Sequence, residues 1–188
     1  MTAPELFQGM AEIMPEEIKA KFPWHEGLCI LSTRIAMDVG AYFRIDVQPL
    51  ACQVFICNRQ FHQHVLAKED YDVEKWYQLD GSHSIGIGFD KYETPGRYNG
   101  HVIAVADGVY GDFSIRQAER VEQGIVTGPA VIGPYMAGIP GWEVVSEEDG
   151  TRLEYYVKEN QSGFKDAPDW RDAQRRKSIV GRIIRALR

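Results

Sequence analysis

Two residues, Asp107 and Gly108, separate two short runs of strand-forming residues. The run before them, 101–106, is mostly Val, Ile and Ala, and the run after them, 109–113, contains Val, Tyr and Phe. An Asp-Gly pair in this setting is typical of a two-residue hairpin turn, in which both central residues take positive φ angles. The chain is therefore expected to contain an antiparallel β-hairpin.

Further strands are predicted on both sides of this hairpin. Residues 45–57 are rich in Val, Ile and Phe and predict a long strand interrupted near Pro49. Residues 82–89 alternate in polarity and predict another strand, whereas the polar segment 58–80 indicates an irregular insertion with one short helix. A second hairpin is predicted for 142–157, around the turn Glu-Glu-Asp-Gly.

Helical periodicity is clearest at residues 29–43. Apolar side chains recur there at spacings of three and four along one face: Leu28, Leu31, Ile35, Val39 and Phe43. A short helix is also predicted at 15–20, ended by Pro23-Trp24. A helix packed on an antiparallel sheet makes this an α+β protein.

The chain of 188 residues suits one compact domain. We assign residues 1–165 to that domain and 166–188 to a basic amphipathic C-terminal helix. No apolar run is long enough to span a bilayer, and the N-terminus lacks the pattern of a signal peptide. These features predict a cytoplasmic protein.

The net charge of −6 is unevenly distributed. Residues 169–188 contain seven Lys or Arg and two Asp, a local charge of +5 that leaves −11 for the rest. The acidic main body argues against nucleic-acid binding. The C-terminal helix suits a membrane surface, an acidic protein partner or the chain's own acidic body, and we favour self-docking over the membrane.

The three cysteines, an odd number, do not suit a disulfide scaffold. Cys52 and Cys57 lie five positions apart on a predicted strand, so they would point to opposite faces and are interpreted as core residues. Cys29 is different, because it falls in the first turn of the predicted helix. The partial positive charge of a helix N-terminus favours a reactive thiolate, and free backbone N–H groups there can stabilise an oxyanion.

His101 and Asp112 supply what a cysteine nucleophile requires. They lie on the two arms of the first hairpin, where residue 101 pairs with a residue near 114 and Asp112 is a diagonal neighbour within reach of the imidazole. An imidazole can accept the thiol proton, and a carboxylate can fix its tautomer. The preceding glycines, Gly100 and Gly111, are expected to leave room for a substrate backbone.

This arrangement resembles the transglutaminase-like branch of the papain-like cysteine enzymes, over about residues 24–118. The matching stretches are Gly27-Leu28-Cys29 with its helix, the strand from Ile45, the run 100–105 and the run 109–112. The resemblance implies a papain/transglutaminase-like fold in which Cys29 is the nucleophile, His101 the general base and acid, and Asp112 the residue that orients it.

Two departures from the family pattern leave the substrate class open. Val102-Ile103 stands where an aromatic residue often follows the His, and Phe113-Ser114 follows the Asp in place of Pro or Thr. The segment also resembles uncharacterised proteins of bacteriophages and their bacterial hosts.

Other residues are assigned to the site on weaker grounds. Trp24 and His25, just before Cys29, are expected to line a substrate cleft, and His83 is expected near His101 if the strand at 82–89 neighbours the His101 strand. The pair His62-x-His64 is interpreted as solvated polar residues, since no carboxylate or cysteine ligand accompanies it. We therefore predict no metal and no organic cofactor.

Two functions are consistent with the sequence. The first is a cysteine hydrolase, a protease or amidase acting on a protein, peptide or other amide, or an acyltransferase working through the same thioester; acetyl transfer from coenzyme A stays open. The second is an inactive interaction protein or phage structural protein on the same fold, docking through its C-terminal helix.

Overall fold

The computed structural model describes residues 1–22, 28–66, 81–89, 98–146 and 148–188. These residues form an α+β structure. Its α-helices are α1 (Ala3–Lys21), α2 (Leu28–Tyr42), α3 (Arg59–Leu66), α5 (Pro168–Arg171) and α6 (Ala173–Ala186). Its strands are β1 (Gln48–Cys57), β2 (Ser84–Ile87), β3 (His101–Ala106), β4 (Val109–Asp112), β5 (Val131–Pro134), β6 (Gly141–Val145) and β7 (Arg152–Val157). Short 3-10 helices cover Ile115–Ala118, Val121–Gln123 and Gly163–Asp166.

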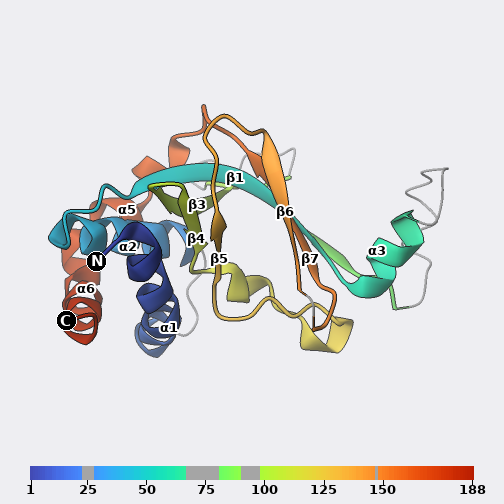
Figure 1. Cartoon of the computed structure of the whole chain (residues 1–188), viewed down its shortest axis with the longest axis horizontal. Helices are drawn as coiled ribbons and strands as arrows, with labels where there is room; N and C mark the ends of the chain where they lie inside the picture. Colours follow the sequence, from blue (N-terminus) through green and yellow to red (C-terminus); the bar gives the residue numbers. More distant parts are fainter. Residues whose placement is uncertain (23–27, 67–80, 90–97, 147) are drawn as a thin grey trace.

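The strands form one antiparallel sheet in the order β5-β4-β3-β1-β7-β6. The long strand β1 is central: β7 pairs along one edge, while β3 and then β2 pair along successive parts of the other edge. Helices α1, α2, α5 and α6 gather near one end of β1, and α3 lies beyond its other end (Figure 1).

Both predicted hairpins are confirmed. In the first, Asp107 and Gly108 have φ angles of 43° and 77°, as a type I′ turn requires, and Ala106 pairs with Val109. In the second, β6 pairs with β7. Strand β5 was not predicted; its four residues include Gly133 and Pro134, which are uncommon in strands, and it forms by pairing with β4.

The sheet is curled. Trp142 on β6 lies near one edge of the strand order and Tyr110 on β4 near the other, yet their ring centroids are 4.9 Å apart. Trp142 also stacks on Tyr155 of β7 at 5.0 Å. The concave face therefore has an aromatic core of its own.

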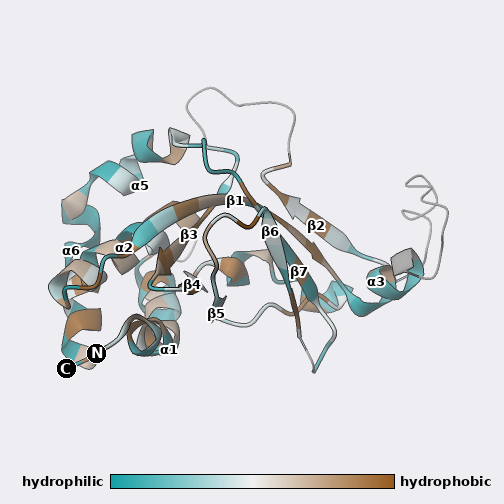
Figure 2. Cartoon of the chain, turned by 45° about the horizontal axis from the view of Figure 1, so that its top comes forward, coloured by the Kyte–Doolittle hydropathy of each residue, from teal (hydrophilic) through white to brown (hydrophobic). Residues whose placement is uncertain are grey.

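Helices α1, α2 and α6 cover the opposite face where β3 and β4 lie, burying Val39, Ala104, Phe113, Ile179 and Ile183 among others. Figure 2 shows hydrophobic stretches along α2 and the strands, and mainly hydrophilic residues on α5. None of the helices within the described ranges is both long and apolar enough to cross a membrane.

The helix predicted at 15–20 is present, but its predicted start is wrong, because α1 begins at Ala3 and contains Pro15 in its interior. Thr2 and Glu5 form a capping box that starts the helix, with Thr2 accepting from the Glu5 N–H and Glu5 accepting from the Thr2 N–H. Leu6, Phe7, Met10 and Met14 give it a fully buried face. The burial of this face outweighs the loss of one helical hydrogen bond at Pro15.

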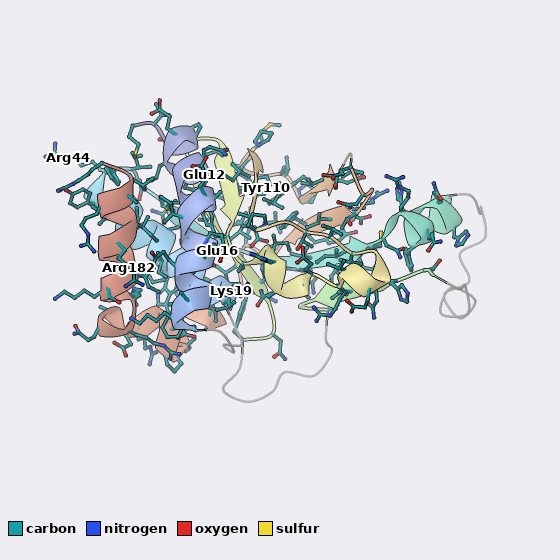
Figure 3. The ribbon with its side chains drawn as sticks, turned by 90° about the horizontal axis from the view of Figure 1, so that it is seen from below. Glu12, Glu16, Lys19, Arg44, Tyr110 and Arg182 are labelled. Atoms are coloured by element: carbon teal, nitrogen blue, oxygen red, sulfur yellow. The ribbon has the colours of Figure 1, made fainter. Side chains whose placement is uncertain are left out.

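The C-terminal segment packs on its own domain. Asp172 interrupts it between α5 and α6 and caps α6 by accepting from two backbone N–H groups. Ile179 and Ile183 are fully buried in the core that α1 and α2 share. Arginines on its flanks pair with acidic residues: Arg176 with Asp38 of α2, and Arg182 with Glu17 of α1. Figure 3 shows α1 and α6 side by side, with Arg182 on α6.

Candidate active site

Cys29 lies in the first turn of α2, as predicted. Backbone N–H groups of a first helical turn have no helical acceptor, so they are available to another group. The Thr33 hydroxyl of the next turn donates to the Val102 carbonyl of β3 at 2.9 Å, which ties the start of α2 to that strand. The Cys29 side chain packs in a cluster with Val102 and Phe164 and is only 5% exposed.

His101 begins β3 and Asp112 ends β4. Their side chains meet as the hairpin register predicts: His101 Nε2 lies 2.6 Å from Asp112 Oδ2. Both side chains are completely buried. This contact fixes the ring orientation and makes Nε2 the protonated nitrogen that donates to the carboxylate.

The pair is electrostatically coupled. Burial by itself would lower the pKa of His101, but the charge and hydrogen bond of Asp112, followed by interactions with the Cys29 thiol, raise that pKa from 6.5 to about 10. Burial would raise the pKa of Asp112, whereas His101 and the hydrogen bonds from Ser114 together lower it. Both residues are therefore charged at neutral pH.

The second ring nitrogen of His101 is the link to Cys29. Nδ1 is buried and has no hydrogen-bond partner of ordinary geometry among the described residues. The Cys29 thiol is nevertheless close enough for hydrogen bonding and charge interaction to contribute to the raised pKa of His101. The thiol hydrogen turns about the Cβ–Sγ bond, so its direction can change without any movement of the sulfur. The structure thus brings Cys29, His101 and Asp112 together.

Two residues that sequence reasoning missed hold the Asp112 carboxylate. Ser114 donates to Oδ1 through its backbone N–H at 3.2 Å and its hydroxyl at 3.0 Å. The Tyr155 hydroxyl donates to Oδ2 at 3.1 Å. A Ser two residues after an Asp is a recognisable local motif. Tyr155 carries no such signal, because its approach depends on the strand order.

The other cysteines are core residues, as predicted. All three cysteines are free thiols. Cys52 lies directly across from His101 on β1 and is fully buried. Burial, then the nearby Asp112 and Cys29, raise the pKa of the Cys52 thiol. Burial likewise raises the pKa of Cys57, to about 11.

Tyr98 and Phe164 cover the site. The Tyr98 hydroxyl lies 3.2 Å from the His101 carbonyl oxygen and 3.4 Å from Gln161 Oε1. The rings of Tyr98 and Phe164 are in edge contact at 5.6 Å. A cleft of about 430 Å³ lies beside this cover, lined by residues 138–140 and 157–161, Gln161 among them.

The two glycines do not leave room for a substrate backbone in this structure. A Cβ on Gly100 would lie 2.2 Å from the Tyr98 hydroxyl, and one on Gly111 would lie 2.6 Å from the Phe113 ring. The missing side chains instead admit these two aromatic rings. The prediction that Gly100 and Gly111 make room for a substrate backbone is therefore wrong.

Three further candidates were predicted for the site. Trp24 and His25 lie outside the described residues. The expected neighbourhood of His83 is wrong, because β2 pairs with β1 beyond the end of β3: Ser84 is opposite Cys57, whereas His101 is opposite Cys52. At 3.3 Å per residue, His83 is roughly 20 Å along β1 from His101.

The pair His62 and His64 lies on α3, where His62 contacts Arg152 and His64 contacts the Ser82 hydroxyl. Within the described ranges no three His, Cys, Asp or Glu side chains are grouped so that they could bind a metal ion.

Comparison with protein-family models, curated proteins and solved structures finds no match to this chain.

Proposed function

We propose that the chain is a cysteine enzyme in which Cys29 is the nucleophile, His101 the general base and acid, and Asp112 the residue that orients the imidazole. One observation carries this proposal: a fully buried His–Asp pair, 2.6 Å apart, leaves its other ring nitrogen beside a thiol at a helix start. A buried ion pair is expensive to desolvate, so it is weak evidence of a purely stabilising role.

The reaction class is amide hydrolysis or acyl transfer. The Cys29 thiolate attacks the carbonyl carbon and forms a C–S bond while the carbonyl oxygen takes the negative charge. Backbone N–H groups of the first turn of α2 stabilise that oxyanion. His101 then donates its Nδ1 proton to the leaving nitrogen as the C–N bond breaks. Water or an amine, deprotonated by His101, resolves the thioester and restores the thiol.

The fold proposal follows from the same elements. A Cys-bearing helix packed on an antiparallel sheet, followed along the chain by a His strand and an Asp strand, resembles the transglutaminase-like branch of the papain-like enzymes. We propose that α2, β1, β3 and β4 form a catalytic core of that kind. Its substrate would be a protein, peptide or other amide, and its setting the cytoplasm of a bacterium or an infected host.

We propose that the substrate approaches the sulfur past Tyr98 and Phe164. Cys29 is 5% exposed, so the cover must move for a carbonyl to reach its sulfur. The cleft lined by Gln161 lies next to this cover, because the Gln161 side chain also contacts the Tyr98 hydroxyl. We propose that it receives the part of the substrate next to the scissile bond.

Trapping an acyl-enzyme tests this proposal. The protein is incubated with an activated thioester or aryl ester, quenched in acid and analysed by peptide mass spectrometry. The proposal expects an acyl group on Cys29 that hydroxylamine removes, and none on Cys52 or Cys57. The His101→Ala variant should accumulate it at least 100-fold more slowly. Acylation of all three thiols at one slow rate would overturn the proposal.

The burial of Cys29 favours a second candidate, an inactive protein that keeps the cluster for structure alone. In that case Cys29 fills the core as Cys52 does, and the His101–Asp112 pair only joins two strands. The alternative expects no acylation of Cys29 even when the covering Phe164 ring is removed.

A further inference from the structure

The Tyr155 hydroxyl reaches Asp112 from a distant strand. In the sheet order, β7 and β4 are separated by β1 and β3. At about 4.8 Å per strand these two strands would lie roughly 14 Å apart in a flat sheet. The curl of the sheet and the length of a tyrosine close this distance, so that the hydroxyl lies 3.1 Å from Asp112 Oδ2.

Asp112 is fully supplied with donors. Oδ2 accepts from His101 and Tyr155, and Oδ1 accepts from the N–H and the hydroxyl of Ser114. A carboxylate offers about four lone-pair positions, so all are used. Such a carboxylate cannot rotate without breaking several hydrogen bonds at once.

Tyr155 is itself held in place. Its ring is buried, stacks on Trp142 at 5.0 Å with an interplanar angle of 10°, and lies 5.7 Å from the Tyr110 ring. Burial, followed by the negative charge of Asp112, raises the pKa of the Tyr155 phenol well above 10. The phenol is therefore a permanent donor whose direction is set by the β6–β7 hairpin.

We propose that Tyr155 is a positioning residue of the active site, through which the β6–β7 hairpin fixes the Asp112 carboxylate and hence the orientation of the His101 imidazole. This inference rests on the proposed function for its effect on reactivity. The hydrogen bond itself makes a prediction that does not depend on catalysis.

The test compares Tyr155→Phe with Tyr110→Phe. Each variant removes one hydroxyl from the same buried aromatic group and keeps the ring, but only Tyr155 donates to Asp112. Tyr110 lies on β4 (Figure 3). Two quantities are measured across pH 4–9: the rate of Cys29 alkylation by iodoacetamide, and the NMR resonance of the His101 Nε2 proton.

When the Tyr155 hydroxyl is lost, the Asp112 carboxylate accepts more strongly from its remaining hydrogen-bond donors, including His101. In Tyr155→Phe we therefore expect the Nε2 proton to move downfield. Because the carboxylate and the imidazole are then held less firmly, we expect the rate of Cys29 alkylation to fall about tenfold across this pH range. Tyr110→Phe should match the wild type. Identical profiles for the two variants would overturn the inference.

A measurement on the wild-type protein tests the hydrogen bond even if the Tyr155→Phe variant does not fold. The Tyr155 hydroxyl proton should exchange slowly and show a nuclear Overhauser contact with the His101 ring. A rapidly exchanging hydroxyl would refute the positioning role. The His101→Ala variant separates the two proposals. If it leaves the rate of Cys29 alkylation unchanged while the Tyr155 hydroxyl proton still exchanges slowly, the proposed function is wrong but the hydrogen bond to Asp112 is confirmed.

Discussion

The carboxylate of Asp112 binds the imidazole of His101 at 2.6 Å although the two residues are not opposite each other in their hairpin. The pairing of Ala104 with Gly111, continued outward, places Asp112 opposite Ile103. The contact is diagonal, and it lies where the first turn of α2 reaches the start of β3. This geometry joins three elements at one buried point.

Replacing Asp112 by Asn should show how much of the His101 charge depends on the carboxylate. The amide keeps the shape and removes the negative charge, so burial then acts on the imidazole without compensation. We expect the pKa of His101 to fall from about 10 to below 6.5. An NMR titration of the ring measures it, and a value that stays near 10 would contradict the coupling.

The stability of the protein should depend on pH through the same pair. Folding raises the pKa of His101 from 6.5 to about 10, so its stabilising contribution is complete below pH 6.5 and is lost as the pH rises through 10. Folding lowers the pKa of Asp112 from 3.8, so its contribution is present above that value and is lost as the pH falls below it.

Urea unfolding at pH 6, 8 and 10 tests this dependence. The free energy of unfolding should fall from pH 6 to pH 10 more steeply in the wild type than in the double variant His101→Gln, Asp112→Asn, which lacks both groups. If the free energy of unfolding depends on pH equally in the two proteins, ionisable residues other than His101 and Asp112 determine that dependence.

Phe164→Ala should expose the thiol. Phe164 packs in the cluster that contains Cys29 and touches both Tyr98 and Trp170. Removing its ring lowers the free energy needed to uncover the Cys29 sulfur. We expect Cys29 to be alkylated about tenfold faster, which corresponds to a change of about 1.4 kcal/mol in that free energy. The matched control is Phe61→Ala, at a buried phenylalanine that packs on Phe55 elsewhere in the sheet. Acceleration by both variants alike would indicate general loosening.

Arg176→Ala should destabilise the protein far more than Arg182→Ala. Arg176 is buried, pairs with Asp38 at 2.5 Å and donates to two backbone carbonyls, so its loss should cost roughly 3–5 kcal/mol. Arg182 pairs with Glu17 at the surface, where a pair contributes about 0–1 kcal/mol. Chemical denaturation measures both values. Equal losses of stability would contradict the expectation that the buried arginine contributes more than the surface one.

The sequence predicted the elements that have strong local signals. The Asp-Gly turn gave the first hairpin, its register and the diagonal contact between His101 and Asp112. The apolar repeat gave α2 within one residue at each end. These features depend on neighbours close in the chain, where periodicity and turn chemistry decide the structure.

Features that depend on distant contacts were not predictable. The four residues of β5 become a strand by pairing with β4, and α1 continues through Pro15 because its apolar face is buried. His83 was misplaced because the sequence does not show that β2 and β3 share one edge of β1. For the same reason Tyr155 was missed, since its hydroxyl meets Asp112 across two intervening strands.

The most direct test of the central claim is the rate of Cys29 alkylation by iodoacetamide near pH 6, resolved by peptide mass spectrometry. Cys52 and Cys57 serve as internal references, because both are buried thiols in the same protein. The account predicts that Cys29 reacts at least tenfold faster than either reference, and that His101→Ala abolishes this advantage. Alkylation of Cys29 no faster than Cys52, or unaffected by His101→Ala, would contradict the account.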